Sequence, residues 1–398
     1  MSNNRMNDKV SNSNPDTDEV QQFSRIDGEP VRFGTGWISG VMGITLSGVG
    51  LFTVLCIQFP NLLTMPMLRE YYPLPIIRLL LHIILVSGFL LGVLSVTLRK
   101  RKVIGSLAIL FALVAGLLGG SQIQLDVSNS LFGSDSLPSL SLDWFLLNLI
   151  LWCAIFIPLE RGFALRREQP IFRHGWRTDL AYFFVATLIV QWVTILTMKP
   201  AQVVFAWVLD DQWRTAIGVQ PIGLQIVEIL LITDFMQYWV HRAFHRIPWL
   251  WKFHAIHHSA ERMDWLAGSR LHIVDIVVTR GLSYVPLFVL GFSDAALLGY
   301  GVIVTLQATW IHANLRLEGR IFRNGLARYL IVTPRFHHWH HSDQPEAIDK
   351  NFSVHLPIWD WVFGSFYLPG ERWPASYGVQ GKKPPEGFFR QLFWPFKR

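Results

Sequence analysis

Charged residues are scarce in this chain. Only 16% of its 398 residues are Asp, Glu, Lys or Arg, whereas 51% are hydrophobic. A soluble globular protein carries about 25% charged residues. The shortage therefore argues against a soluble protein and favours a chain with several segments buried in a bilayer.

Cysteine is nearly absent as well. The only two, Cys56 and Cys153, lie far apart in sequence, and each is inside an apolar run. They form no CxxC motif and cannot supply a disulfide framework. We expect both to be packing residues within the membrane core.

Several familiar metal and cofactor motifs are missing too. The chain has neither the HExxH motif of zinc proteases nor the paired ExxH motifs of soluble di-iron bundles. A CxxCH haem-attachment motif and a GxGxxG dinucleotide fingerprint are also absent. These absences argue against each of the corresponding protein classes.

Long apolar runs, in contrast, are abundant. A helix needs about 20 apolar residues to cross the hydrocarbon core, and eight runs approach that length. They occupy residues 37–59, 76–98, 103–123, 144–159, 180–198, 222–240, 273–290 and 295–310. We therefore predict an all-α, polytopic, multi-pass integral membrane protein.

Lys and Arg residues indicate how these runs cross the bilayer. They gather in the N-terminal tail and in segments 99–102 and 161–177, but segment 124–143 contains neither. Because cytoplasmic loops are rich in Lys and Arg, the N-terminus is predicted to be cytoplasmic. Six spans then return the chain to the cytoplasm at His241, and the hairpin 273–310 returns it again.

The net charge of +7 does not require a nucleic-acid partner, because the Lys and Arg residues lie at the ends of the apolar runs, where membrane orientation requires them.

Histidine is concentrated in a single window. Twelve of the 14 histidines lie between residues 241 and 355, where an even spread would place about four. Eight of them form one HxxxH and two HxxHH patterns, namely His241, His245, His254, His257, His258, His337, His340 and His341. Offsets of three and four bring side chains to one face of a helix. Eight imidazoles are too many for one ion and suit two, although imidazole binds Fe, Zn, Cu and Ni alike.

The histidine pattern is also compatible with functions other than a catalytic di-metal site. A pH-sensing or proton-relay patch would not need the repeated offsets. A zinc-dependent membrane hydrolase could use the same ligands. A non-enzymatic metal transporter or sensor would place ligands through the spans, whereas these patterns gather at one predicted face. Asp234 lies seven residues before His241 and could orient a ligand imidazole through its free N–H.

Five segments resemble the fatty acid hydroxylase/sterol desaturase superfamily. They are 234–245, 253–259, 333–342, His312-Ala-Asn314 and 359–364. The resemblance implies an enzyme with two iron ions, which uses O₂ and electrons from a separate protein to hydroxylate or desaturate a lipid. It also implies the metal ligands His241, His245, His254, His257, His258, His312, His337, His340 and His341, with His272 as a tenth candidate. Asp234, Asn314 and Asp275 would support them.

One departure from the family pattern concerns His272. Many members have Arg-x-His-Pro-x-Glu where this chain has Arg270-Leu-His-Ile-Val-Asp275.

We expect four parts: a disordered polar tail (1–35), an N-terminal membrane module (36–224), a cytosolic-face helical di-metal domain (225–370) and a C-terminal tail (371–398). The lipid could be a fatty acyl, sterol-like or other isoprenoid chain. Hydroxylation, desaturation and ether cleavage share the same histidine patterns.

Overall fold

The structure, a computed structural model, describes residues 34–65, 71–125, 139–205, 211–316 and 325–397, together with 25–26, 29–30, 69 and 322. The predicted tail 1–35 therefore falls almost wholly outside the described residues. Apart from two paired strands of two residues each, β1 (Arg25–Ile26) and β2 (Glu29–Pro30), the regular elements are helical. The chain divides into two units, residues 1–144 and 145–398.

The first unit is built on three long apolar helices that pack on one another: α2 (Trp37–Gln58), α5 (Leu74–Leu98) and α6 (Val103–Leu117). Short helical turns, α3 (Pro60–Leu63) and η1 (Gly120–Gln122), follow α2 and α6. A Cβ added at Gly105 would lie 2.7 Å from the carbonyl oxygen of Gly92. Glycine at this crossing therefore allows the backbones of α5 and α6 to approach closely, as small residues do between membrane helices.

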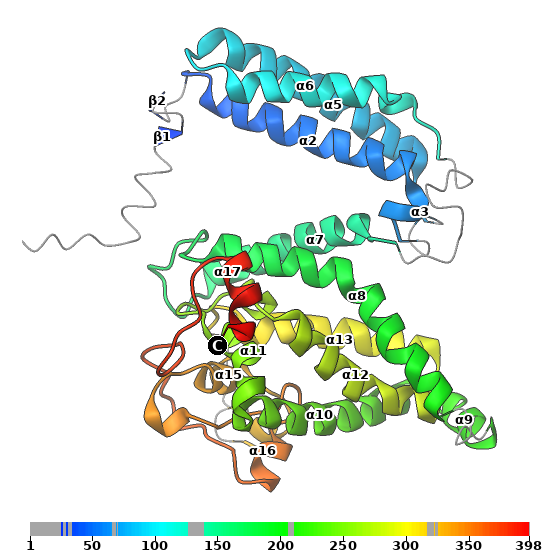
Figure 1. Ribbon diagram of the computed structural model, residues 1–398, viewed down its shortest axis with the longest axis vertical. Helices are drawn as coiled ribbons and strands as arrows, with labels where there is room; N and C mark the ends of the chain where they lie inside the picture. Colours follow the sequence, from blue (N-terminus) through cyan, green and yellow to red (C-terminus); the bar gives the residue numbers. More distant parts are fainter. Residues whose placement is uncertain are drawn as a thin grey trace, which may run out of the picture. The chain divides into compact units, whose positions relative to one another are not determined.

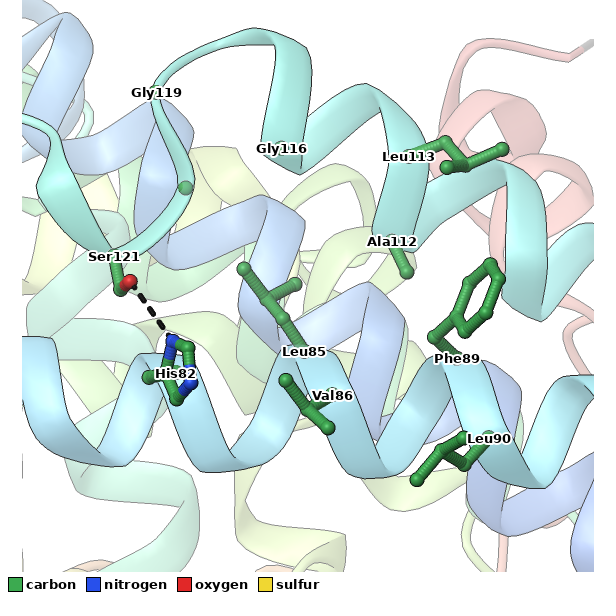
Figure 2. Close-up of a pocket in the computed structure, with 11 residues that line it drawn as sticks. His82, Leu85, Val86, Phe89, Leu90, Ala112, Leu113, Gly116, Gly119 and Ser121 are labelled. Atoms are coloured by element: carbon green, nitrogen blue, oxygen red, sulfur yellow. Dashed lines mark hydrogen bonds between the residues drawn. The ribbon is translucent and has the colours of Figure 1, made fainter.

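A cavity of about 350 Å³ opens between α5 and α6. Figure 2 shows its apolar wall, which includes Leu85, Phe89 and Leu113. His82 and Ser121 form a hydrogen bond of 3.2 Å at one end. The cavity is thus an apolar groove with one polar end.

The second unit contains the remaining helices. The long ones are α7 (Leu142–Gly162), which begins just before the unit boundary, α8 (Trp176–Phe205), α10 (Ile222–Arg246), α12 (Ile273–Leu290) and α13 (Asp294–His312). The shorter ones are α9 (Asp211–Gly218), α11 (Pro248–His258), η2 (Ala267–Ser269), η3 (Leu326–Tyr329), α15 (Pro334–His340), η4 (Pro345–Ala347), α16 (Ile358–Val362), α17 (Phe388–Phe393) and η5 (Trp394–Phe396). Helices α10, α12 and α13 run side by side, and α11 and α15 lie at one end of them (Figure 1).

Among the described residues, six helices are long and apolar enough to cross a membrane: α2, α5, the segment Val103–Gln122, α7, α12 and α13. A seventh span is possible if Gln212–Gly218 and α10, which meet at a bend of 112°, count as one. The prediction of an all-α, multi-pass integral membrane protein is confirmed. Of the eight predicted runs, six correspond to these helices, and 222–240 lies in α10 of the bent pair. The run 180–198 forms a helix, α8, that is not among the candidate spans. The orientation across the bilayer stays a prediction.

The division at residue 144 falls within the predicted N-terminal module, 36–224. Residues 145–224 thus group with the histidine-rich segments, and α8 packs along α12. Among the described residues, the predicted C-terminal tail includes α17, which packs on α8. The predicted domain boundaries themselves remain predictions.

Candidate metal centre

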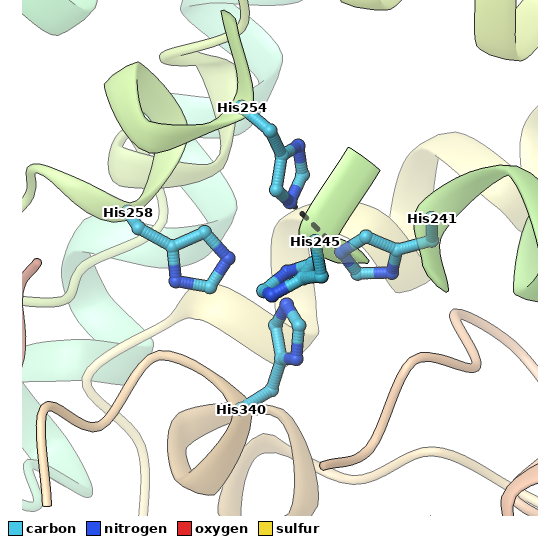
Figure 3. A group of neighbouring side chains, drawn as sticks. All are labelled: His241, His245, His254, His258 and His340. Atoms are coloured by element: carbon cyan, nitrogen blue, oxygen red, sulfur yellow. Dashed lines mark hydrogen bonds between the residues drawn. The ribbon is translucent and has the colours of Figure 1, made fainter. Parts of the chain in front are cut away.

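The structure gathers nine buried or half-buried histidines into two groups. The five-histidine group consists of His241, His245, His254, His258 and His340 (Figure 3). The four-histidine group consists of His257, His312, His337 and His341. Within each group, one ring nitrogen from every histidine lies within 4.8 Å of the others. Nine of the ten predicted ligand candidates therefore meet. The sequence predicted two ions, but it did not predict how these histidines divide between two groups.

Each HxxHH pattern supplies both groups. On α11, His254 and His258 belong to the five-histidine group and His257 to the four-histidine group. At α15, His340 belongs to the former, and His337 and His341 to the latter. The ring centroids of His258 and His341 are only 4.5 Å apart, so the two groups adjoin. Two short helices thus hold both groups in a fixed relation.

Hydrogen bonds to carbonyl groups fix the tautomers of several rings. The Nδ1–H groups of His241 and His340 donate to the carbonyl oxygens of Phe352 and Lys350, at 2.6 and 2.8 Å. In the four-histidine group, His257 and His312 donate from Nδ1 to the carbonyls of Arg270 and Ala308. The Nε2 atom of each ring is then left with a lone pair, as metal ligation requires.

The Nε2 atoms of these rings fit a metal ion. Those of His257 and His312 face each other at 3.3 Å, although both rings already use their proton at Nδ1. Two facing lone pairs repel unless a cation lies near them. In addition, the buried Nε2 atoms of His245, His258 and His340 have no hydrogen-bond partner. Buried polar atoms without partners call for an ion or another ligand, so the residues present fit two metal ions.

Burial keeps the imidazoles outside the membrane spans neutral. It lowers the pKa of His257, His258, His337, His340 and His341 well below the ordinary value, and neighbouring histidines lower it further. A metal ligand must be deprotonated, and a neutral imidazole already is. The folded chain thus presents ligands that need not lose a proton to bind.

Of the predicted supporting residues, only Asp275 contacts a histidine of either group. Its Oδ2 accepts from Nδ1 of His254 at 2.7 Å, which directs Nε2 of that ring toward the five-histidine group. Asp234 instead accepts the backbone N–H groups of residues 354–356. Asn314 pairs with both backbone groups of Arg166. These two side chains therefore fix the chain around the site rather than an imidazole.

His272 lies in neither group. Its Nδ1 accepts the backbone N–H of Val274 at the start of α12, and its Nε2–H donates to the carbonyl oxygen of Leu392 at 3.0 Å. Both ring nitrogens are thus occupied. His338, beside the ligand candidates, is occupied in the same way: its Nδ1 pairs with the hydroxyl of Tyr377 and its Nε2 with the carbonyl of His312.

A buried ion-pair cluster supports the centre from outside the histidine patterns. The guanidinium of Arg173 contacts Asp179 at 2.6 Å and Asp264 at 2.7 Å, and Arg270 contacts Asp179 at 2.5 Å. The carbonyl of Arg270 in turn receives the N–H of His257. In the sequence, Arg173 is only one of the basic residues that predict a cytoplasmic location for segment 161–177. Nothing local indicates that Asp179 is its partner.

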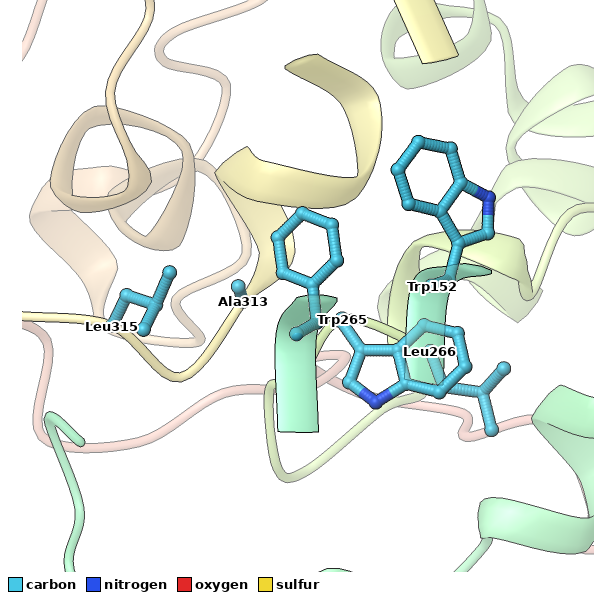
Figure 4. Packing of buried hydrophobic residues seen from close by; sticks show 6 residues of the cluster. Trp152, Trp265, Leu266, Ala313 and Leu315 are labelled. Carbon is cyan, nitrogen blue, oxygen red and sulfur yellow. The ribbon is translucent and has the colours of Figure 1, made fainter. Parts of the chain in front are cut away.

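An apolar cluster lies beside these ion pairs. Figure 4 shows Trp152 of α7 near Trp265 and Leu266, which precede η2; Ala313 and Leu315, which follow α13, lie on the other side of the same cluster. Phe156 completes the cluster. This packing joins α7 to the segment that precedes His272 and to the segment that follows His312.

We expect Asp275→Asn to weaken metal binding. The carboxylate orients His254 and increases its basicity, and loss of such a partner typically lowers metal affinity by about 10- to 100-fold. Competition with a chelator would measure the change in the purified protein. The exposed Glu261→Gln variant is the control, and equal metal retention in both variants would contradict the assigned role of Asp275.

The centre and its surroundings resemble known proteins. Residues 226–365 match the fatty acid hydroxylase family. Over 188 residues the chain is 33% identical to ornithine lipid hydroxylase OlsE of Rhizobium tropici, covering 47% of this chain and 53% of OlsE. It is 30% identical over 164 residues to human alkylglycerol monooxygenase, covering 40% of this chain and 35% of that protein. It is 27% identical to mouse lathosterol oxidase over 187 residues, covering 42% of this chain and 58% of that protein.

The matched regions cover only part of these relatives, about half of OlsE and about a third of the human protein. No solved structure matches the chain.

Proposed function

We propose that the chain is a membrane-bound oxygenase that inserts oxygen into a C–H bond of a lipid, because residues 226–365 match the fatty acid hydroxylase family. The observation that carries the proposal is the pair of adjoining, all-histidine groups. We propose that they hold two iron ions, and that the ligands are the nine histidines of the two groups.

Iron, when bound, would supply the activation of O₂, while the protein supplies orientation and electrostatics. Five imidazoles on one ion and four on the other would leave room for a small molecule to bind. The ligands carry no negative charge, so the centre would be strongly positive. The buried carboxylate of Asp275 and the backbone carbonyls that receive the Nδ1–H groups partly offset that charge.

A lipid substrate is consistent with the surroundings of the centre. His241 and His245 of the five-histidine group lie at the end of α10, and His312 of the four-histidine group ends α13, which is a candidate span. Both groups therefore lie where apolar helices meet polar segments. Two relatives are named for an ornithine lipid and an alkylglycerol, both of which are lipids with polar head groups. We propose hydroxylation of such a lipid, with electrons from a separate protein and the centre at the cytoplasmic face.

Lipid analysis of a host with and without this chain would test the proposal. The expected result is a lipid that gains one oxygen atom, and purified protein that consumes O₂ when given that lipid and a reductant. The His257→Ala variant should lose both effects. Zinc in place of iron with no O₂ uptake would overturn the oxygenase assignment, and a mass shift that persists in His257→Ala would overturn the site.

A further inference from the structure

The C-terminal segment exposes an aromatic face. In α17 and η5, the side chains of Phe389, Phe393 and Phe396 are 74%, 59% and 64% exposed. Their spacing of four and three residues places them on one side of the helical segment. Contiguous exposed apolar surface of this kind marks a contact with a membrane or another protein.

This segment is held firmly against the second unit. The carbonyl of Leu392 accepts from His272, and the ring of Phe388 lies 4.8 Å from that of Tyr182 on α8. Gln391 is buried and donates to the hydroxyl of Ser259 at 3.4 Å. Because these contacts hold one side of α17, the three exposed phenylalanines lie on the side that faces away from the second unit.

A fourth exposed aromatic residue extends the patch. Trp249, in the first turn of α11, is 61% exposed, and its ring lies 6.4 Å from that of Phe253. Phe396 lies 5.5 Å from the same Phe253 ring. We call Trp249, Phe389, Phe393 and Phe396 together the aromatic rim.

Basic residues accompany the aromatic rim. Lys252, Arg390 and Lys397 are exposed on the same two segments, and residues 387–397 include no Asp or Glu. The rim also lies at the level where a span begins, since His272, which holds Leu392, caps the start of α12. Aromatic side chains mixed with Lys and Arg at the end of a span are typical of the membrane–water interface.

We propose that the aromatic rim docks into the head-group region of the leaflet beside the metal centre, and that its basic residues bind anionic lipid phosphates. Phe253, which links the two parts of the rim, is followed directly by His254 of the five-histidine group. Contact with the leaflet would thus seat α11 and the centre at a defined depth. This role for the C-terminal segment goes beyond the proposed oxygenation and does not depend on it.

Site-directed labelling of the full chain in lipid nanodiscs tests the proposal. In a background where Cys56 and Cys153 are replaced by Ala, Phe393→Cys would carry a fluorophore. The matched control is Glu386→Cys, two residues before α17, where the native side chain is 83% exposed. We expect lipid-attached quenchers to quench the label at residue 393 several-fold more than the label at residue 386, and iodide in water to show the reverse.

Equal access of iodide to both positions would overturn the proposal. Protection of residue 393 from both quenchers would also overturn it, since it would mean that protein covers the rim. Anionic nanodiscs should increase quenching by lipid-attached quenchers relative to neutral ones, and the pair of substitutions Arg390→Gln and Lys397→Gln should remove that increase. These measurements read the depth of the segment and leave the oxygenation chemistry untested, so the two proposals fail separately.

Discussion

Replacing His337 with alanine should remove the metal bound by the four-histidine group and abolish activity, whereas replacing the adjacent His338 should leave both metal ions in place. Nε2 of His337 lies 2.9 Å from that of His312 and 3.1 Å from that of His341, so its loss leaves three imidazoles. His338 is equally buried, but both of its ring nitrogens pair with protein groups. Elemental analysis of the purified variants measures the difference.

The two variants differ by one position in a single short helix, so a general loss of folding would affect both. Burial lowers the pKa of His338 to about 3, which keeps its ring neutral and unable to act as a buried charge. If His338→Ala lost metal and His337→Ala kept both ions, the division into a five- and a four-histidine group would be refuted.

Asp179→Asn should destabilise the second unit by about 3–5 kcal/mol, because it leaves two buried guanidinium groups short of an anion. Arg173 and Arg270 both contact this carboxylate; without it, Arg173 keeps its contact with Asp264, whereas Arg270 loses its ion pair with Asp179. A thermal melt in detergent should show a fall of roughly 10 °C in melting temperature. Because Arg270 also receives the N–H of His257, metal retention should fall as well.

An exposed ion pair in the same unit provides the control. Lys383 and Glu261 lie 2.7 Å apart on the surface, and Glu261→Gln should change the melting temperature little, since exposed pairs contribute little to stability. A melting temperature for Asp179→Asn equal to that of Glu261→Gln would contradict the role assigned to the buried cluster.

The sequence predicted which histidines gather, because helical offsets are local. It could not predict that each HxxHH pattern would divide, since that depends on how α11 and α15 are rotated against each other. For the same reason, the partners of His272 were not predictable. Its ring meets Leu392, which is 120 residues away, and nothing in the pattern Arg270-Leu-His distinguishes that contact from metal ligation.

Composition and hydropathy predicted the membrane helices correctly as elements. The ion-pair cluster was missed because its members are separated by up to about a hundred residues and each resembles an ordinary loop charge. The C-terminal segment was predicted to be a tail because its apolar residues are too few to span a bilayer. Its packing against α8 and α11 depends on tertiary contacts that hydropathy does not describe.

The metal content of the purified, full-length chain tests the central claim most directly. Two adjoining groups of neutral histidines should bind two metal ions per chain, and the proposed oxygenase chemistry requires those ions to be iron. Elemental analysis of protein isolated from iron-replete cells should therefore find two irons per chain. One metal ion per chain, or two ions of zinc, would contradict this account.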